Sequence, residues 1–155
     1  MRLFVLLTLG GLLCASCGNP PWMAESHQID MSGWSSEAPL HFSWDVESAD
    51  QTFDLVLDVR HSQKYPFSNL YLFCTYQFPN GKTRVDTIEC TLADDLGKWR
   101  GRGFGDLVEQ RFMLHQGISF PSSGQHGMRI IHGMRQDPIS GIASIGLRLE
   151  AEATP

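Results

Sequence analysis

Apolar and polar residues alternate along much of this chain with a period of two. In residues 53–60, which read FDLVLDVR, the odd positions are apolar and the even positions are mostly charged, and residues 142–150 alternate in the same way. Side chains on one face of a β-strand recur at every second residue. Each segment is therefore expected to form a strand that packs one face and leaves the other face in water.

Similar signals recur every ten to fifteen residues and predict further strands at 40–46, 70–78 and 83–92. Residues 124–135 fit neither the helical nor the strand period cleanly, and we interpret them as one more strand. Turn-forming residues separate the segments, at 79–81, 94–97, 122–124 and 137–141. The sequence thus predicts an all-β fold, an antiparallel β-sandwich resembling a jelly roll.

The N-terminus has the layout of an export signal. Arg2 is followed by a mostly apolar stretch at 3–13. A helix of about eleven residues reaches only ~16 Å, whereas a membrane span must cross about 30 Å. The next residues, Ala15-Ser16-Cys17, resemble the lipobox of bacterial lipoproteins, in which the cysteine is acylated and the peptide is cut before it. The alternative is an ordinary signal peptide cleaved near Ala15-Ser16, which would leave Cys17 as a thiol.

Three parts of the chain follow from these signals. Residues 1–16 are the expected signal peptide, residues 17–38 a lipidated flexible tether, and residues 39–151 the β-sandwich domain. The tether is rich in Pro, Gly and Ser and shows no clear period. It also contains Trp22 and Trp34, and Trp34 is either the first docked residue of the domain or an exposed recognition residue.

The charge of the chain excludes some partners. Twelve Lys and Arg face 17 Asp and Glu, for a formal net charge of −5, and the cations form no cluster. Binding to nucleic acid or to anionic lipid relies on many cationic contacts. We therefore expect no nucleic-acid partner, and we expect attachment to the lipid bilayer to depend on acylated Cys17 alone.

Two of the four cysteines remain available for a disulfide if Cys14 leaves with the signal and Cys17 is acylated. In a tight hairpin about Asn80-Gly81, Cys74 lies opposite Thr87 and Cys90 faces the other side. A three-residue turn puts both cysteines on one face but about 13 Å apart along the strands, beyond disulfide reach. Both registers predict that Cys74 and Cys90 are free thiols.

Motifs for catalysis or cofactor binding are missing. The histidines at 27, 41, 61, 115, 126 and 132 form no metal-binding arrangement, and the serines at 119, 122 and 123 near His126 lack a nucleophile elbow. Residues 101–106, GRGFGD, lack the sixth-position glycine of a dinucleotide loop and more simply mark a bulge or bend where backbones approach. We expect no metal, no cofactor and no enzymatic activity.

Several longer blocks point to a family. They are HFSWDV, DLVLDVRH, YPFSNLYLF, FPNGK, DTIECTLAD, GKWRGRGFGD, FPSSGQHGMRI and MRQDPISGIASIGLRLE. An exported lipoprotein of this size that carries these blocks in this order, over residues 41–150, resembles the gliding-motility lipoprotein family GldH of the Bacteroidetes. The resemblance implies a non-enzymatic component of the gliding apparatus, tied to type IX secretion, with envelope proteins as partners. Residues 18–21, GNPP, lack the acidic cluster that resembles a surface-export signal in this phylum, so we expect the domain to face the periplasm from the outer membrane.

Six residues within the matched blocks form the candidate functional or fold-fixing set. They are Arg60, Tyr65, Asn69, Trp99, Arg135 and Asp137. Arg60 can hold a carboxylate in a two-pronged bond, and Asp137 is a possible partner. The alternatives are that the arginines and Asp137 pin loops through ordinary ion pairs, with Tyr65 and Trp99 closing the sandwich, or that the set forms a binding patch.

A carbohydrate-binding module of the cell envelope is the alternative function. Sugar binding on a β-sandwich needs two or three coplanar, exposed aromatic rings. The available candidates are Trp44, Phe67, Tyr71 and Trp99. The exposure of these four rings in the folded protein distinguishes the two functions.

Overall fold

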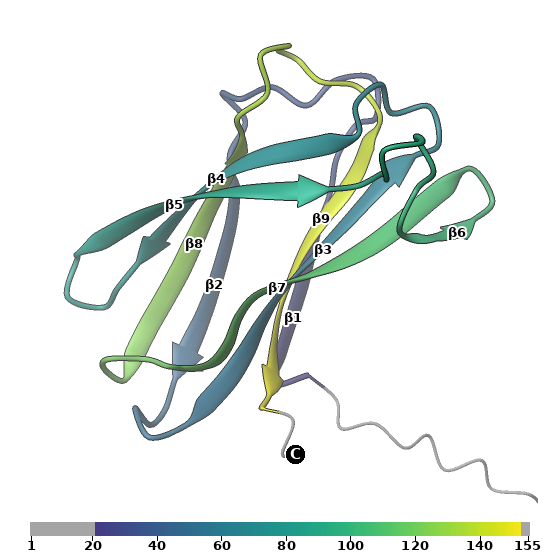
Figure 1. The fold of residues 1–155 in the computed structure, drawn as a ribbon. Coiled ribbons are helices and arrows are strands. Elements are labelled where there is room, and N and C mark those ends of the chain that lie inside the picture. The colour runs from purple at the N-terminus through teal and green to yellow at the C-terminus, as the bar shows by residue number, and fades with distance from the viewer. Residues whose placement is uncertain (1–20, 153–155) are drawn as a thin grey trace, which may run out of the picture.

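The computed structural model describes residues 21–152, apart from the side chain of Phe104, and shows two layers of β-strands (Figure 1). The predicted signal peptide, Cys17 and the first residues of the predicted tether lie outside the described residues. None of the described residues belongs to a helix of membrane-spanning length and apolarity. The strands are β1 (Met23–Gln28), β2 (Leu40–Val46), β3 (Thr52–Ser62), β4 (Asn69–Gln77), β5 (Thr83–Thr91), β6 (Arg102–Phe104), β7 (Leu107–Ser119), β8 (Gly124–His132) and β9 (Ile142–Ala151).

The strands pair in a nested order, as if one long hairpin had been rolled up. β4 pairs with β5, β3 with β7, β2 with β8 and β1 with β9, all antiparallel. The result is one sheet in the order β1-β9-β3-β7-β6 and a second in the order β2-β8-β4-β5. This nesting is the jelly-roll arrangement of an antiparallel sandwich. The predicted fold class is confirmed, and so is the interpretation of residues 124–135 as mainly strand.

The prediction of a flexible tether over residues 17–38 is wrong from residue 23 onward. Strand β1 runs along β9 from Met23 opposite Leu149 to Gln28 opposite Ser144. Trp34 is 3% exposed and forms a backbone bridge with Ile139, so it is docked and not an exposed recognition residue, but it is not the first docked residue because β1 precedes it. The sequence signal is weak because β1 is an edge strand of mostly polar residues. Its pairing depends on backbone hydrogen bonds, which do not require apolar side chains.

Strands β6 and β7 have no clear period in the sequence. Residues 101–106 form β6 and the turn into β7, with Gly105 at a φ of 61°. The expected close approach of backbones occurs at Gly101, where an added Cβ would lie 2.4 Å from the carbonyl oxygen of Glu109. The pairing of β7 with β3 contains register shifts near Leu55. Such irregularities interrupt the alternation of buried and exposed residues along β7, from which a strand would be predicted.

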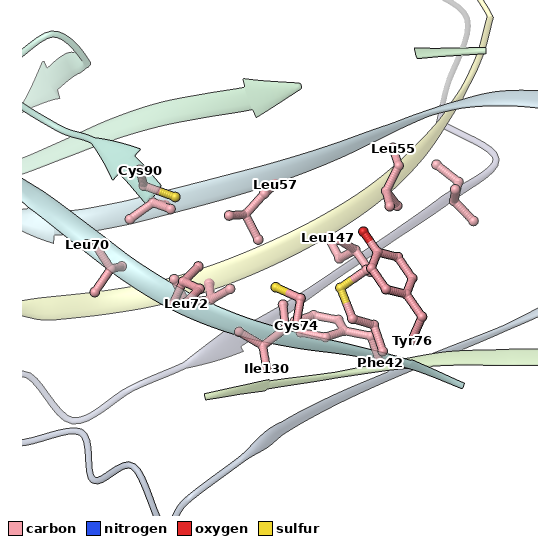
Figure 2. Packing of buried hydrophobic residues seen from close by; sticks show 14 of the residues in the cluster. Phe42, Leu55, Leu57, Leu70, Leu72, Cys74, Tyr76, Cys90, Ile130 and Leu147 are labelled. Carbon is pink, nitrogen blue, oxygen red and sulfur yellow. The ribbon is translucent and has the colours of Figure 1, made fainter. Parts of the chain in front are cut away.

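The core lies between the two sheets (Figure 2). Leu55 and Leu57 of β3 and Leu147 of β9 point into it from one sheet, and they are fully buried. From the other sheet come the alternate residues of β4 and the inward residues of β2 and β8, including Leu70, Leu72, Phe42 and Ile130. Each fully buried aliphatic side chain contributes about 1.5–3 kcal/mol. The apolar residues that recur at every second position are therefore the ones whose burial stabilises the fold.

Cys74 and Cys90 are free thiols, as predicted. Phe78 and Lys82 close a three-residue turn, and the register places Cys74 opposite Asp86 and Cys90 opposite Leu70. The register with Cys74 opposite Thr87 is therefore wrong, and the three-residue alternative is correct. Both side chains point into the core, separated along the sheet (Figure 2).

The prediction that one face of β3 is wet is wrong for the first half of the strand and holds at Arg60, which is exposed. Asp54 is 5% exposed and Val56 is 1% exposed, although both lie on the outer face. Strand β3 is the middle strand of its sheet, between β9 and β7. The amide of Gly117 donates to Asp54 at 2.9 Å, and Arg111 and Arg148 both bond to Asp58. Backbone and side-chain groups of the neighbouring strand residues thus cover the part of this face around Asp54 to Asp58.

Candidate functional site

Four loops gather at one end of the sandwich, opposite the start of β1 and the end of β9 (Figure 1). These distal loops are residues 29–39, 63–68, 92–101 and 133–141. Five of the six candidate residues lie in these loops or directly beside them, and Arg60 lies on the outer face of the first sheet, near the end of β3. The structure therefore brings most of the candidate set to one end of the molecule but divides it among different environments.

Asp137 joins two of the distal loops. Its carboxylate accepts a hydrogen bond of 3.0 Å from the amide of Ser36 and a second from the Ser36 hydroxyl. These bonds hold the pKa of Asp137 below its ordinary value of 3.8. The buried ring of His132 lies 3.4 Å from the same carboxylate, and Trp34 packs against that ring. Asp137 therefore fastens the loop before β2 to the loop before β9.

The possible pairing of Arg60 with Asp137 is wrong. Arg60 bonds instead to Glu109, which lies directly opposite it in the pairing of β3 with β7. Both side chains are more than 40% exposed. Exposed ion pairs of this kind contribute about 0–1 kcal/mol, so this pair adds little to the stability of the sheet.

Tyr65 and Asn69 support the start of β4. Tyr65 is 3% exposed, and its hydroxyl donates to the carbonyl of Asn69 at 3.1 Å. Burial raises the pKa of Tyr65 well above its ordinary value. Gly141, at a φ of 89°, lies against Tyr65, where a Cβ would come within 3.2 Å of the Tyr65 Cα. The Asn69 amide donates to Glu89 at 2.7 Å. These contacts favour a fold-fixing role for Tyr65.

His61 is a buried titratable residue that the candidate set omitted. Its ring is fully buried, packs against the half-buried ring of Trp99 at 4.5 Å, and lies near the carbonyl of Ser62 at 3.0 Å. Burial lowers its pKa below 6.5. The signal was present in the sequence, because position 61 continues the inward series of odd positions in β3. Within residues 21–152, no three His, Cys, Asp or Glu side chains gather to form a metal site.

Arg135 borders an apolar pocket of about 550 Å³, which we call the Arg135 pocket. Its lining is Phe67, Tyr71, Gly133, Met134, Arg135 and Gln136. Arg135 is exposed, and no carboxylate among the described residues lies within ion-pairing distance of it. Its guanidinium is therefore available to a group outside the chain.

Short contacts brace the walls of the Arg135 pocket. The amide of Gly133 donates to the carbonyl of Tyr71 at 2.7 Å. A Cβ at Gly133 would lie 2.8 Å from the ring of Phe73, so only glycine fits there without a shift. Tyr71 and Phe73 are 37% and 39% exposed and extend the apolar surface across β4. These contacts fix the position of Gly133 in the wall of the pocket.

The aromatic rings considered for sugar binding do not form an exposed row. Trp44 is 5% exposed in the core, and Phe67 and Trp99 are partly buried against the core. Of the four rings, Tyr71 alone is among the exposed large hydrophobic residues in the described part of the chain. The carbohydrate alternative therefore loses the arrangement on which it depended.

Comparison with solved structures returns weak overall likenesses. Residues of this chain align with part of a family GH115 4-O-methyl-alpha-glucuronidase at a TM-score of 0.41 and 12% identity, covering 88% of this chain and 18% of that one. The infectious bursal disease virus VP2 subviral particle aligns at a TM-score of 0.32 and 13% identity, covering 84% and 35%. The chain thus spans well under half of either protein.

Comparison of sequences is far more specific. Residues 22–149 match the family described as GldH lipoprotein. The chain is 30% identical over 124 residues, 76% of each chain, to the gliding motility lipoprotein GldH homolog of Christiangramia forsetii. It is 27% identical over 152 residues, 94% of each chain, to the gliding motility lipoprotein GldH of Flavobacterium johnsoniae. The matched region includes β1, which agrees with a domain that begins near residue 22. This chain therefore belongs to the GldH lipoprotein family.

Proposed function

We propose that this lipoprotein is anchored in the outer membrane through acylated Cys17, faces the periplasm, and serves the gliding and type IX secretion-linked machinery without catalysing a reaction. Its family membership and the lipobox-like residues before Cys17 support the anchor and the general role. We further propose that it acts by binding a partner protein. The Arg135 pocket is the observation that supports this binding function.

The chemistry of the pocket defines the partner segment. Phe67, Tyr71 and Met134 offer apolar surface on which an apolar side chain can be buried. A guanidinium at the rim can bind a carboxylate through two parallel hydrogen bonds. The segment that fits is therefore a peptide stretch with an acidic residue close to an apolar one. Because the walls are already braced at Gly133, binding requires little reorganisation of this chain.

The anchor is tested by the variant Cys17→Ala. We expect the wild-type protein to carry the mass of a lipid adduct and to sediment with membranes, because acyl chains supply the apolar area for stable attachment. The variant should lack the adduct and remain in the soluble fraction after a high-salt wash. Continued sedimentation of an unacylated variant would show that another segment attaches the protein.

The partner surface is tested by Arg135→Ala, with Arg102→Ala as the matched control. Both arginines are exposed and have no ion pair among the described residues, but Arg102 lies on β6, away from the pocket. We expect both variants to keep the wild-type Tm within a degree or two. Only Arg135→Ala should reduce the release of type IX cargo, or gliding in a host that glides, at normal protein levels. Equal phenotypes in the two variants, or turnover of a substrate lost in one of them, would contradict the proposal.

A further inference from the structure

Both ends of the described chain lie at one end of the sandwich, opposite the distal loops (Figure 1). Met23 at the start of β1 lies opposite Leu149, and Phe53 at the start of β3 lies opposite Ala151 at the end of β9. We call this the terminal end and define it by Trp22, Phe53, Phe120 and Ala151. The loops at 47–51, between β2 and β3, and at 121–123, between β7 and β8, lie at the same end of the sandwich (Figure 1).

The connection from the predicted anchor to the terminal end is short. Four residues separate Cys17 from Trp22 in the sequence. Fully extended, such a segment spans at most ~18 Å, and as a flexible coil it spans about 12 Å. Since β1 begins at Met23, the longer spacing expected from a 22-residue tether does not apply. An acyl anchor at Cys17 therefore keeps the terminal end within reach of the lipid headgroups.

Trp22 gives this end a side chain suited to an interface. Its ring is 41% exposed, and its centroid lies 5.0 Å from that of Phe53, which is buried. Phe53 lies 5.9 Å from Phe120, and Phe120 lies 5.9 Å from Trp44, so a row of rings closes the sandwich here. Trp22 is thus held on the folded domain, and tryptophan is enriched where protein meets the polar surface of a bilayer.

From these observations we infer that the terminal end rests on the lipid surface, with Trp22 at the interface and the distal loops directed away from it. The inference rests on the proposed acylation of Cys17. The charged residues at this end indicate which kind of lipid surface it can contact. Glu47, Asp50 and Glu152 are exposed there, and Lys82 lies in the neighbouring turn between β4 and β5. Acidic groups gain nothing from anionic lipid, so the surface that fits is a zwitterionic one.

This orientation places the Arg135 pocket far from the membrane. Strand β3 runs for 11 residues between the two ends of the sandwich. At about 3.3 Å per residue it separates the terminal end from the distal loops by roughly 33 Å. A partner that binds the Arg135 pocket therefore approaches from the aqueous compartment and not from within the bilayer.

The inference is tested with the full-length acylated protein in phosphatidylethanolamine–phosphatidylcholine vesicles whose acyl chains carry bromine, which quenches nearby tryptophans. We expect the lipid-dependent quenching to fall by more than about half in Trp22→Phe, because interfacial tryptophans lie nearest the acyl chains. The matched control Trp99→Phe, at the distal end, should leave the quenching unchanged. Quenching that survives in Trp22→Phe, or is lost in Trp99→Phe, would overturn the orientation.

An intact-mass measurement on the same sample separates this inference from the proposed anchor. An acylated protein without quenching at Trp22 overturns the orientation and leaves the anchor in place. A membrane-bound protein without the lipid adduct overturns the anchor itself. Unacylated Cys17→Ala protein mixed with the same vesicles should show no quenching, since a single tryptophan on an acidic surface is too small a membrane contact. Quenching of that variant equal to wild type would contradict the role of the short connection.

Discussion

The backbone amide of Ser36 donates a hydrogen bond of 3.0 Å to the carboxylate of Asp137, although the two residues lie 101 positions apart in the chain. Next to it, Trp34 and Ile139 exchange two backbone hydrogen bonds, at 2.7 and 2.9 Å. The first and last loops of the rolled-up hairpin are therefore fastened together. This closure holds the loop that carries Arg135 in one arrangement, so the stability of the distal end bears on the proposed binding site.

We predict that Asp137→Asn lowers the Tm at neutral pH and that the difference shrinks in acid. The Ser36 hydrogen bonds hold the pKa of Asp137 below 3.8 in the folded protein. Their contribution is complete above the unfolded value near 3.8 and is lost as the pH falls through the lower folded value. Thermal unfolding at pH 7, 5 and 3 measures the effect. Asp95→Asn, at an exposed turn position, is the control and should leave the Tm unchanged. A difference between Asp137→Asn and wild type that is constant over this range would contradict the prediction.

A second pH dependence is expected from His61. Burial lowers the pKa of this histidine below 6.5, so the folded protein holds the ring neutral while the unfolded chain takes up a proton below that pH. The stability that this provides is complete above pH 6.5 and is lost as the pH falls below it. We predict that the Tm of wild type drops by a few degrees more than that of His61→Phe between pH 7.5 and 5.5. His41→Phe, at an exposed site, should follow the wild type, and parallel curves for all three proteins would refute the idea.

Removal of the Tyr65 hydroxyl should cost about 1 kcal/mol, the usual contribution of a buried hydrogen bond. Tyr65→Phe keeps the ring against Phe67 and Gly141 but removes the donor to the Asn69 carbonyl. Urea unfolding of the detergent-solubilised protein measures the loss. Tyr71→Phe, at a side chain that is 37% exposed, is the control and should change the unfolding free energy by much less. Equal effects would show that burial at Tyr65 is unimportant.

The thiols of Cys74 and Cys90 should be unreactive until the protein unfolds. Both side chains are fully buried, and burial raises the pKa of each to about 12. We predict no alkylation of either residue in the native acylated protein at pH 8 and two additions after unfolding without reductant, read by mass. Cys74→Ala should reduce the count to one. A wild-type mass that is two hydrogens lighter and takes up no reagent would reveal a disulfide.

Much of the core was predictable from the sequence because burial there follows a local rule. Strands β2, β3, β4 and β9 each turn one face toward the core, and buried apolar residues recur on that face at every second position. Glycine, proline and asparagine mark the turns between them for equally local reasons. The free state of the two thiols also followed, since neither of the hairpin registers considered brings Cys74 within reach of Cys90.

The remaining features were decided by contacts between distant segments. Strand β1 is held by backbone bonds to β9, so its polar sequence resembles a tether. The register of β3 against β7 places Arg60 opposite Glu109, with which it forms an ion pair. Asp137 accepts hydrogen bonds from Ser36 instead. The Arg135 pocket likewise exists only where the loop after β8 crosses the start of β4. The periodic pattern of apolar residues predicts which face of a strand is buried. Which distant residues pair with one another depends on the register and topology of the whole sandwich, and these are not encoded in that periodicity.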